Sequence, residues 1–507
     1  MNNAFKPLGL AAAVAAASAG VAHAQTVANN DLGDLALVPY YTVNGEWVTG
    51  IHIVNTSSKT QVVKFRFRRA ADSLDALDFN VVMSPKDVYA GFLGDGDGPI
   101  KWTADDTSCT VPVEDGSSLE MPPIYNPNGE AATGYVEIIA MGQPTSEDLP
   151  IAVAAKHDEG APVNCAAVRS NFFANGVLAD TRGVVDFETT YQVDPGGEEA
   201  LTGTNTFEDS GNALKVSYFI RDNASGVEFG DNAVHIADFL TQPSMTNQEF
   251  GWLSGDLDGF DFPDLDGGVP TAATPERGRF NALRGILGNQ ILVNEWSVNP
   301  DNGVALDWVV TLPGQYTMMD TPEFAAFEVF DDDPETVCAR GVCDFRDIPV
   351  VASIANYDRE ERFPVPEGPE PGDLVVSPNI PGPPEEPVVT ELIKEVNVIT
   401  FGDGSVLGVS DVNVSDPGVP QPFGWLNLSV SSADSNIAVC SWNTAEDTMG
   451  GPLISPEQLV ALQSEACTPV TNTGVPMIGF AAWARSVAAN PDASYGRIIE
   501  HSFASSL

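Results

Sequence analysis

Apolar and polar residues alternate with a period of two along the first part of the chain. The alternation covers residues 47–54, 63–68 and 77–83, and Val63, Phe65 and Phe67 alternate with Lys64, Arg66 and Arg68. Residues 135–141 and 151–155 add two apolar runs. A period of two, bounded by Gly, Pro, Asn and Asp, predicts antiparallel strands with one buried face. We therefore expect a β-sandwich domain over residues 25–195.

The same pattern continues towards the C-terminus. We predict strands at 214–220, 308–312, 325–330, 395–401, 425–430 and 477–482. Two short helices are expected at 279–287 and 456–462, the second with Ser455 as its N-cap and Pro456 at its first position. The expected fold class is mainly β, with antiparallel β-sandwich-like domains and a few short helices.

A proline-rich tract divides the later part of the chain. It lies within residues 363–389, and proline cannot donate the hydrogen bonds of a strand ladder. We therefore expect a linker there, between a middle β-rich domain (196–362) and a C-terminal β-rich segment (390–507). Whether that segment packs on the middle domain is left open.

The first 24 residues have the features of a signal peptide. Lys6 precedes an apolar run, and Ala22-His23-Ala24 forms a small-x-small cleavage pattern. The run is shorter than the ~20 residues needed to span a bilayer. We expect Sec-dependent export to the outside or the cell surface, with the periplasm as the alternative, and no membrane span in the mature chain.

The chain is strongly acidic, with 71 Asp and Glu against 23 Lys and Arg and a net charge of −48. Such a charge repels nucleic acids and anionic membranes, and it suits either a salty medium or Ca²⁺ binding. Pairs of Asp residues near Gly make candidate Ca²⁺ sites, although Asp-Gly is also common in hairpin turns. These candidates are Asp95, Asp97, Asp256, Asp258, Asp264 and Asp266. No cofactor is certain.

The six cysteines favour disulfides in an exported protein. Sequence proximity favours the pairs Cys109–Cys165, Cys338–Cys343 and Cys440–Cys467, out of fifteen possible arrangements. No His lies near a CxxC-like pair, so metal binding by these cysteines is the weaker interpretation.

A basic stripe is the exception in this acidic chain. Lys64, Arg66, Arg68 and Arg69 lie within six residues, and the first three share one face of a predicted strand. Two interpretations are open. The stripe either pairs with the chain's own carboxylates on a solvated sheet face, or forms a contact surface for an acidic partner.

Common catalytic motifs are absent: the sequence has no HExxH, GxSxG, P-loop or GxGxxG that opens a helix. A glycosidase needs only two carboxylates, and a pair of this kind has no distinguishing pattern among 71 Asp and Glu residues, so the hydrolase alternative stays open.

Several short phrases carry a resemblance. They are PYYT at 39–42, LDFN at 77–80, SCTVP at 108–112, GYVE at 134–137, DWVVT at 307–311 and EVNVI at 395–399. Together they resemble an uncharacterised group of secreted or surface proteins of Gram-negative bacteria. The resemblance implies one architecture across the proline-rich tract and a structural role, and it supplies no functional residues.

We expect an exported structural or interaction protein of the cell surface or extracellular matrix, which self-associates or adheres to other surface components. The alternative is a secreted hydrolase, such as a glycosidase or an esterase-like enzyme. A periplasmic binding protein is disfavoured because alternating βαβ units are missing.

Overall fold

The fold is described from a computed structural model. It describes residues 25–71, 73, 75–94, 98–111, 118–123, 126–172, 188–192, 202–241, 243–244, 263, 265, 278–314, 318–320, 350–357, 388–392, 394–401, 405–408, 413–414, 422–430, 437–440, 467–469 and 475–504. These residues are mainly in strands, arranged in several antiparallel sheets with three short α-helices, which confirms the expected fold class.

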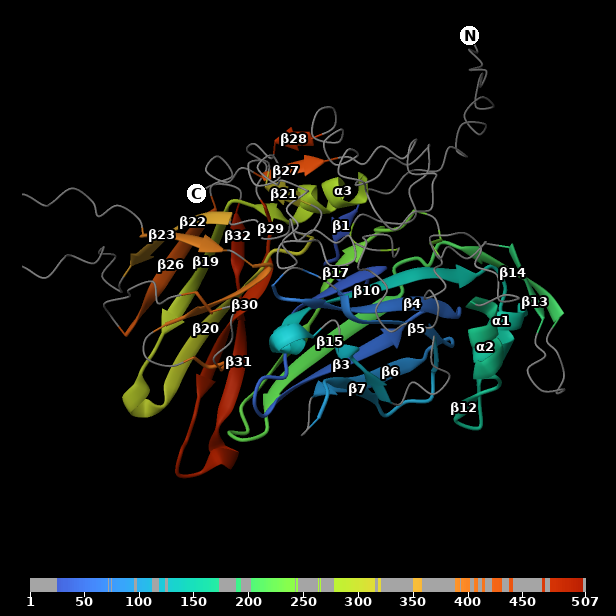
Figure 1. Ribbon diagram of the computed structural model, residues 1–507, viewed down its shortest axis with the longest axis horizontal. Helices are drawn as coiled ribbons and strands as arrows, with labels where there is room; N and C mark the ends of the chain where they lie inside the picture. The colour runs from blue at the N-terminus through green and yellow to red at the C-terminus, as the bar shows by residue number, and fades with distance from the viewer. Residues whose placement is uncertain are drawn as a thin grey trace, which may run out of the picture.

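Two sheets form the first sandwich (Figure 1). The first sheet has the order β1 (Thr26–Val27), β17 (Val234–Ala237), β2 (Leu35–Thr42), β10 (Thr133–Pro144), β4 (Gln61–Arg69), β5 (Asp75–Met83), β8 (Cys109–Val111). In addition, β14 (Thr202–Glu208) pairs with β10, and β13 (Glu188–Gln192) pairs with β14. The second sheet has the order β16 (Glu228–Asn232), β15 (Leu214–Asp222), β3 (Trp47–Asn55), β6 (Val88–Gly94), β7 (Lys101–Ala104), β9 (Ser118–Glu120).

Two further sheets form the second sandwich. The third sheet has the order β25 (Asn413–Val414), β24 (Val396–Thr400), β20 (Val304–Thr311), β30 (Ile478–Arg485), β31 (Tyr495–Glu500). The fourth has the order β23 (Val388–Leu392), β22 (Val350–Tyr357), β26 (Phe423–Val430), β19 (Ile291–Ser297), β32 (Ser502–Ala504). Strands on either side of the proline-rich tract therefore share both sheets.

The remaining elements are short. Small sheets join β11 (His157–Asp158) to β12 (Ala161–Pro162), β18 (Gly288–Asn289) to β29 (Val475–Pro476), and β21 (Met318–Asp320) to β27 (Ile437–Cys440) and β28 (Cys467–Pro469). The helices are α1 (Pro150–Ala155), α2 (Cys165–Phe172) and α3 (Gly278–Leu287).

The sheets divide the chain differently from the expected domains. β15 pairs with β3 and β17 pairs with β2, so strands beyond residue 195 complete both sheets of the first sandwich. The boundary expected at 195 and 196 thus falls inside a sandwich. Likewise β20, from the middle region, pairs with β24 and β30, from the C-terminal segment.

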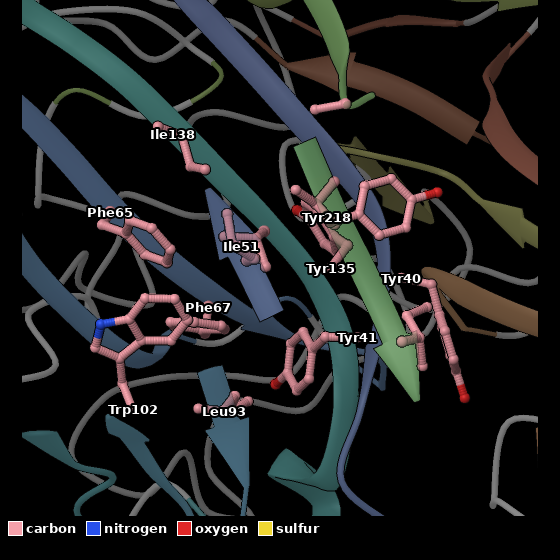
Figure 2. Packing of buried hydrophobic residues seen from close by; sticks show 14 of the residues in the cluster. Tyr40, Tyr41, Ile51, Phe65, Phe67, Leu93, Trp102, Tyr135, Ile138 and Tyr218 are labelled. Atoms are coloured by element: carbon pink, nitrogen blue, oxygen red, sulfur yellow. The ribbon is translucent and has the colours of Figure 1, made fainter. Parts of the chain in front are cut away.

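The core of the first sandwich is aromatic. The alternate residues Phe65 and Phe67 of β4 point towards Trp102 of β7 (Figure 2), with ring centroids 5.1 and 5.6 Å from it. Phe65 also stacks on Phe79 at 5.0 Å. The indole N–H of Trp102 donates to the Tyr89 hydroxyl at 2.9 Å, so this buried donor is satisfied.

The third sheet lies between two cores. On β20, Val309 packs in the core shared with the first sandwich, whereas Trp308 and Val310 pack in the core shared with the fourth sheet. Two hydrogen bonds also join the sandwiches: Thr311 Oγ1 donates to Pro39 O at 2.6 Å, and Val396 N donates to Ala70 O at 3.2 Å. The two sandwiches are therefore fused.

Most predicted elements in the described part are confirmed, and one is wrong. Residues 151–155 form α1 and not a strand, because Pro150 occupies the first helical turn and the alanines that follow favour helix. α1 and α2 pack together on the first sheet. The strand predicted at 325–330, the helix at 456–462 and the signal peptide lie outside the described residues, as does the linker at 363–389 except for its last two residues, which belong to β23.

Two buried titratable groups connect parts of the second sandwich. Asp307 accepts hydrogen bonds from Ser405 Oγ (2.6 Å), Val406 N (2.7 Å) and Leu407 N (2.9 Å), and burial raises its pKa to about 6. His501 lies near Val309 O through Nε2 (3.0 Å) and near Asn294 Nδ2 through Nδ1 (2.8 Å). These partners assign the proton of a neutral ring to Nε2, and burial lowers the pKa of His501 to about 3.

These two groups should change stability with pH in opposite directions. Between pH 3 and 6.5 the unfolded state holds the extra proton on His501, so the free energy of unfolding rises with pH. Between pH 3.8 and 6 the folded state holds the extra proton on Asp307, so that contribution falls with pH. Each contribution is at most about 1.4 kcal/mol per pH unit.

We therefore expect urea unfolding of His501→Gln to show a lower slope of free energy against pH than the wild type between pH 4 and 6. Asp307→Asn, which keeps an acceptor for the loop N–H groups, should show a higher slope. Equal slopes in all three proteins would contradict the pKa shifts that burial gives to His501 and Asp307.

Candidate interaction surface

The four basic residues predicted as a contact surface are buried inside the protein. Lys64, Arg66 and Arg68 have no exposed surface, and Arg69 is 5% exposed. The alternation was read correctly, because the three residues share one face of β4. That face is covered, however, at one end by α1 and α2. The prediction of an exposed basic stripe is thus wrong for this fold.

Carboxylates of β5 neutralise the first two cations. Lys64 Nζ lies 3.0 Å from Asp78 Oδ2, and Arg66 Nη2 lies 3.3 Å from the same oxygen. Arg66 Nε lies 3.4 Å from Asp75 Oδ2. The hairpin register produces these pairs, because Arg66 stands directly opposite Asp78 and Arg68 opposite Asp75.

The third cation joins β4 to β10. Arg68 Nε lies 3.2 Å from Glu137 Oε1, and Arg68 Nη1 lies 3.1 Å from Asp75 Oδ1. The Tyr135 hydroxyl donates to Glu137 Oε1 at 3.0 Å and lies 3.0 Å from Ser73 Oγ. Among the described residues the network balances three cations against three carboxylates, as burial of charge requires.

A sequence signal for this network existed. Asp75 and Asp78 lie on the strand that follows the basic stripe, within reach of a hairpin partner. Acids on the strand adjacent to a basic stripe favour pairing within the sheet. The sequence does not reveal that this face is buried, and burial turns the expected solvated stripe into an internal network.

Removing one carboxylate should destabilise the protein strongly. Asp78→Asn leaves Lys64 and Arg66 buried with less negative charge, and loss of one partner in a buried ion pair costs about 3–5 kcal/mol. The measurement is the free energy of unfolding in urea. Glu295→Gln is the matched control, because Glu295 pairs with Arg497 where both side chains are about half exposed, and it should cost less than about 1 kcal/mol. A similar small loss in both variants would refute the buried network.

The predicted disulfides are resolved in part. Cys109 and Cys165 form a disulfide with a Cα–Cα distance of 5.1 Å, which ties β8 to α2 and confirms that pairing. It closes a segment of 56 residues, worth about 4 kcal/mol in the chain-entropy model. Cys440 stands directly opposite Cys467 in the β27–β28 register. Cys338 and Cys343 lie outside the described residues.

The register makes the Cys440–Cys467 pairing a sharp prediction, because directly opposed residues of antiparallel strands have the Cα separation that a disulfide needs. Alkylating the unreduced protein and mapping its peptides should give a linked Cys440–Cys467 peptide and no alkylated cysteine. Alkylation of Cys440 before reduction would show that the pair is open.

The six candidate Ca²⁺ ligands, Asp95, Asp97, Asp256, Asp258, Asp264 and Asp266, lie outside the described residues. Within the part of the chain that is described, no group of three His, Cys, Asp or Glu residues is arranged to hold a metal ion. The Ca²⁺ sites therefore stay a prediction.

One hydroxyl–imidazole–carboxylate group bears on the hydrolase alternative. His157 Nε2 lies 3.2 Å from Thr107 Oγ1, and Nδ1 lies 3.5 Å from Asp87 Oδ2. The same Asp87 oxygen also accepts from Ser84 N (3.0 Å) and Ser108 Oγ (3.1 Å). The Asp87 carboxylate therefore connects the segments that carry Ser84, Ser108 and His157, and Thr107 Oγ1 donates to Gly160 O. These contacts favour a structural role for the group.

A broad exposed face does exist, on the second sheet. One face of this sheet packs in the aromatic core, and we call the other its open face. On the open face Phe92 is 44% and Val88 47% exposed, and His52 is exposed beside them. Figure 1 shows the strands that carry it, β15, β3, β6 and β7, side by side.

The centre of the open face is a flat aromatic row. Phe219, Gly50 and Phe92 stand directly opposite one another on β15, β3 and β6. The Phe219 ring lies over Gly50, since a Cβ there would be 2.0 Å from a ring carbon. His52 meets Phe219 edge to face at 6.2 Å. Gly50 therefore lets an aromatic ring lie close to the sheet.

The open face differs in charge from the rest of the chain. Its strands place Lys101, Lys215 and Arg221 on this side, against Glu120 and Glu228. Three cations and two carboxylates leave it one positive charge, whereas the whole chain carries −48. The alternation along β3 and β15 predicts the strands but not this exposed face, because exposure depends on what packs over the sheet.

Comparisons with known proteins add no identity. No family model, no curated protein and no solved structure matches the chain. Among the described residues, no helix has the length and apolar character needed to cross a membrane.

Proposed function

We propose that this is an exported structural or interaction protein of the cell surface or extracellular matrix, which assembles with itself through the open face of the second sheet. The supporting observation is the exposed row around Phe92, where apolar side chains lie together on a regular sheet. Exposed apolar patches of this kind mark association sites.

A second copy of this chain is the partner that fits best. Two molecules of charge −48 repel each other over most of their surfaces. The open face is close to neutral, so two copies can approach there with little repulsion. At one edge of this face, Arg221 of β15 and Glu228 of β16 form an exposed ion pair at 3.3 Å. Such pairs can exchange partners across a symmetric interface.

The export part of the proposal is supported by the signal-peptide pattern and by the Cys109–Cys165 disulfide, which is typical of an oxidising compartment. Calcium dependence is a separate question, because the candidate Asp ligands lie outside the described residues. The test therefore treats assembly and calcium as two variables.

Phe92→Ser tests the assembly face. In sedimentation velocity over a concentration series, with Ca²⁺ and then with chelator, the wild type should form dimers or larger species. The variant should assemble at least about tenfold more weakly, because central aromatic residues dominate interface energy. Added salt should strengthen wild-type assembly, since it screens the repulsion between acidic copies.

Trp425→Ala, an exposed aromatic on the second sandwich, is the matched control and should assemble like the wild type. Circular dichroism should be the same for all three proteins. A wild type that stays monomeric at about 100 μM in both media, or a Phe92→Ser variant that assembles normally, would overturn the proposal.

A further inference from the structure

A second group of exposed aromatic residues lies on the second sandwich, far along the chain from the open face. On the fourth sheet, Tyr357, Trp425 and Glu295 stand directly opposite one another on β22, β26 and β19. On the third sheet, Trp483 stands opposite Arg497 on β30 and β31. The Glu295–Arg497 ion pair joins the two sets at 3.3 Å. We call these residues, with Tyr495, the aromatic strip.

Contacts between neighbours hold the strip in place. The Tyr357 and Trp425 rings stack with centroids 4.2 Å apart and planes 11° apart. The Arg497 guanidinium lies 4.9 Å above the Trp483 ring, and Trp483 meets Tyr495 at 5.7 Å. Each side chain is thus oriented before any ligand arrives, which lowers the entropy cost of binding.

The strip is also open to solvent. Trp425 is 37% and Tyr495 48% exposed, and the Glu295 and Arg497 side chains are 52% and 56% exposed. The core does not need Trp425 or Glu295, because the opposite face of β19 and β26 supplies Trp296, Leu426 and Leu428. Trp483 is partly buried and packs against this core with one side. An exposed ion pair adds little stability.

We propose that the aromatic strip binds a neutral polysaccharide. One face of each of Tyr357 and Trp425 is covered by their mutual stacking. The C–H groups of sugar rings carry partial positive charge and pack on the negative ring faces that this stacking leaves uncovered. Hydroxyl groups of the same sugars can hydrogen-bond to the Glu295 carboxylate and the Arg497 guanidinium, which alternate with the rings. A charged polysaccharide with carboxylates or sulfates fits less well, since the chain carries −48.

The linear order of the strip fits a chain ligand better than a small one. Tyr357, Trp425 and Glu295 lie on adjacent strands, which are about 4.8 Å apart. Their row therefore extends about 10 Å across the fourth sheet before the ion pair continues it to Arg497 and Trp483. Sugar units of a polysaccharide repeat at a similar spacing, so successive units can meet successive side chains.

Affinity electrophoresis in native gels that contain hydroxyethylcellulose, xylan or dextran tests this directly, with titration of cellohexaose against tryptophan fluorescence as a second readout. The wild type should be retarded by at least one neutral polymer. Trp425→Ala and Tyr495→Ala should each weaken binding at least about fivefold, as expected for exposed anchors of a binding surface.

Phe92→Ser is the matched control here, because the exposure of Phe92 (44%) lies between those of Trp425 and Tyr495 and Phe92 belongs to the other sandwich. It should bind polysaccharide like the wild type even if it no longer self-associates, and Trp425→Ala should self-associate even if it no longer binds polysaccharide. Failure of this inference and failure of the proposed assembly are thereby distinguishable.

Three results would overturn the inference. The first is a wild type that none of the neutral polymers retards. The second is unchanged binding in both Trp425→Ala and Tyr495→Ala, with circular dichroism showing that each is folded. The third is equal retardation by alginate, a polyanion, which would indicate unspecific association.

Discussion

The structure depends on a sheet that must be apolar on both faces. Val309 of β20 enters one core, while Trp308 and Val310 enter the other, and the third sheet is thereby the wall of two sandwiches. Strands with both faces buried lose the polar alternation that marks a solvated sheet. Because this wall combines β20 from before the proline-rich tract with β24 and β30 from after it, the two chain segments cannot form the second sandwich separately. Both segments are therefore needed for this sheet to form.

The buried charge network on β4 fixes the register of the strands in the first sandwich. A cation without a partner would be unstable under the layer that covers this face, so each of Lys64, Arg66 and Arg68 requires a carboxylate at a fixed register. A slip of β4 against β5 by one residue would turn the three cations into the aromatic core. The network thus specifies register more than it adds stability. It also removes three of the 23 basic residues from the surface, so that the exterior is dominated even more by acids.

Patterns within one strand predicted the fold class well, and contacts between distant segments could not be predicted. β4, β5 and β15 follow from period-two alternation, because their own residues contain the information. Residues 151–155 were misread, since a short run of Ile, Val and Ala suits a buried helix or strand equally and only Pro150 favoured the helix. His501 illustrates the larger gap: its partners Asn294 and Val309 lie about two hundred positions away. The buried stripe and the two exposed surfaces were missed for one reason, namely that burial of a strand's second face is decided by other layers.

The open face of the second sheet and the aromatic strip would together bind a polymer more tightly than the strip would alone. A single exposed strip of aromatic side chains gives weak binding to one stretch of polysaccharide, because little surface is buried. If the open face of the second sheet joins copies, each assembly presents several strips at fixed spacing, and the second contact with a long polymer becomes intramolecular. Weak single sites then hold an assembly firmly while each molecule still exchanges. For the exported protein proposed above, such multivalent contact would hold the assembly at a surface that carries the polysaccharide.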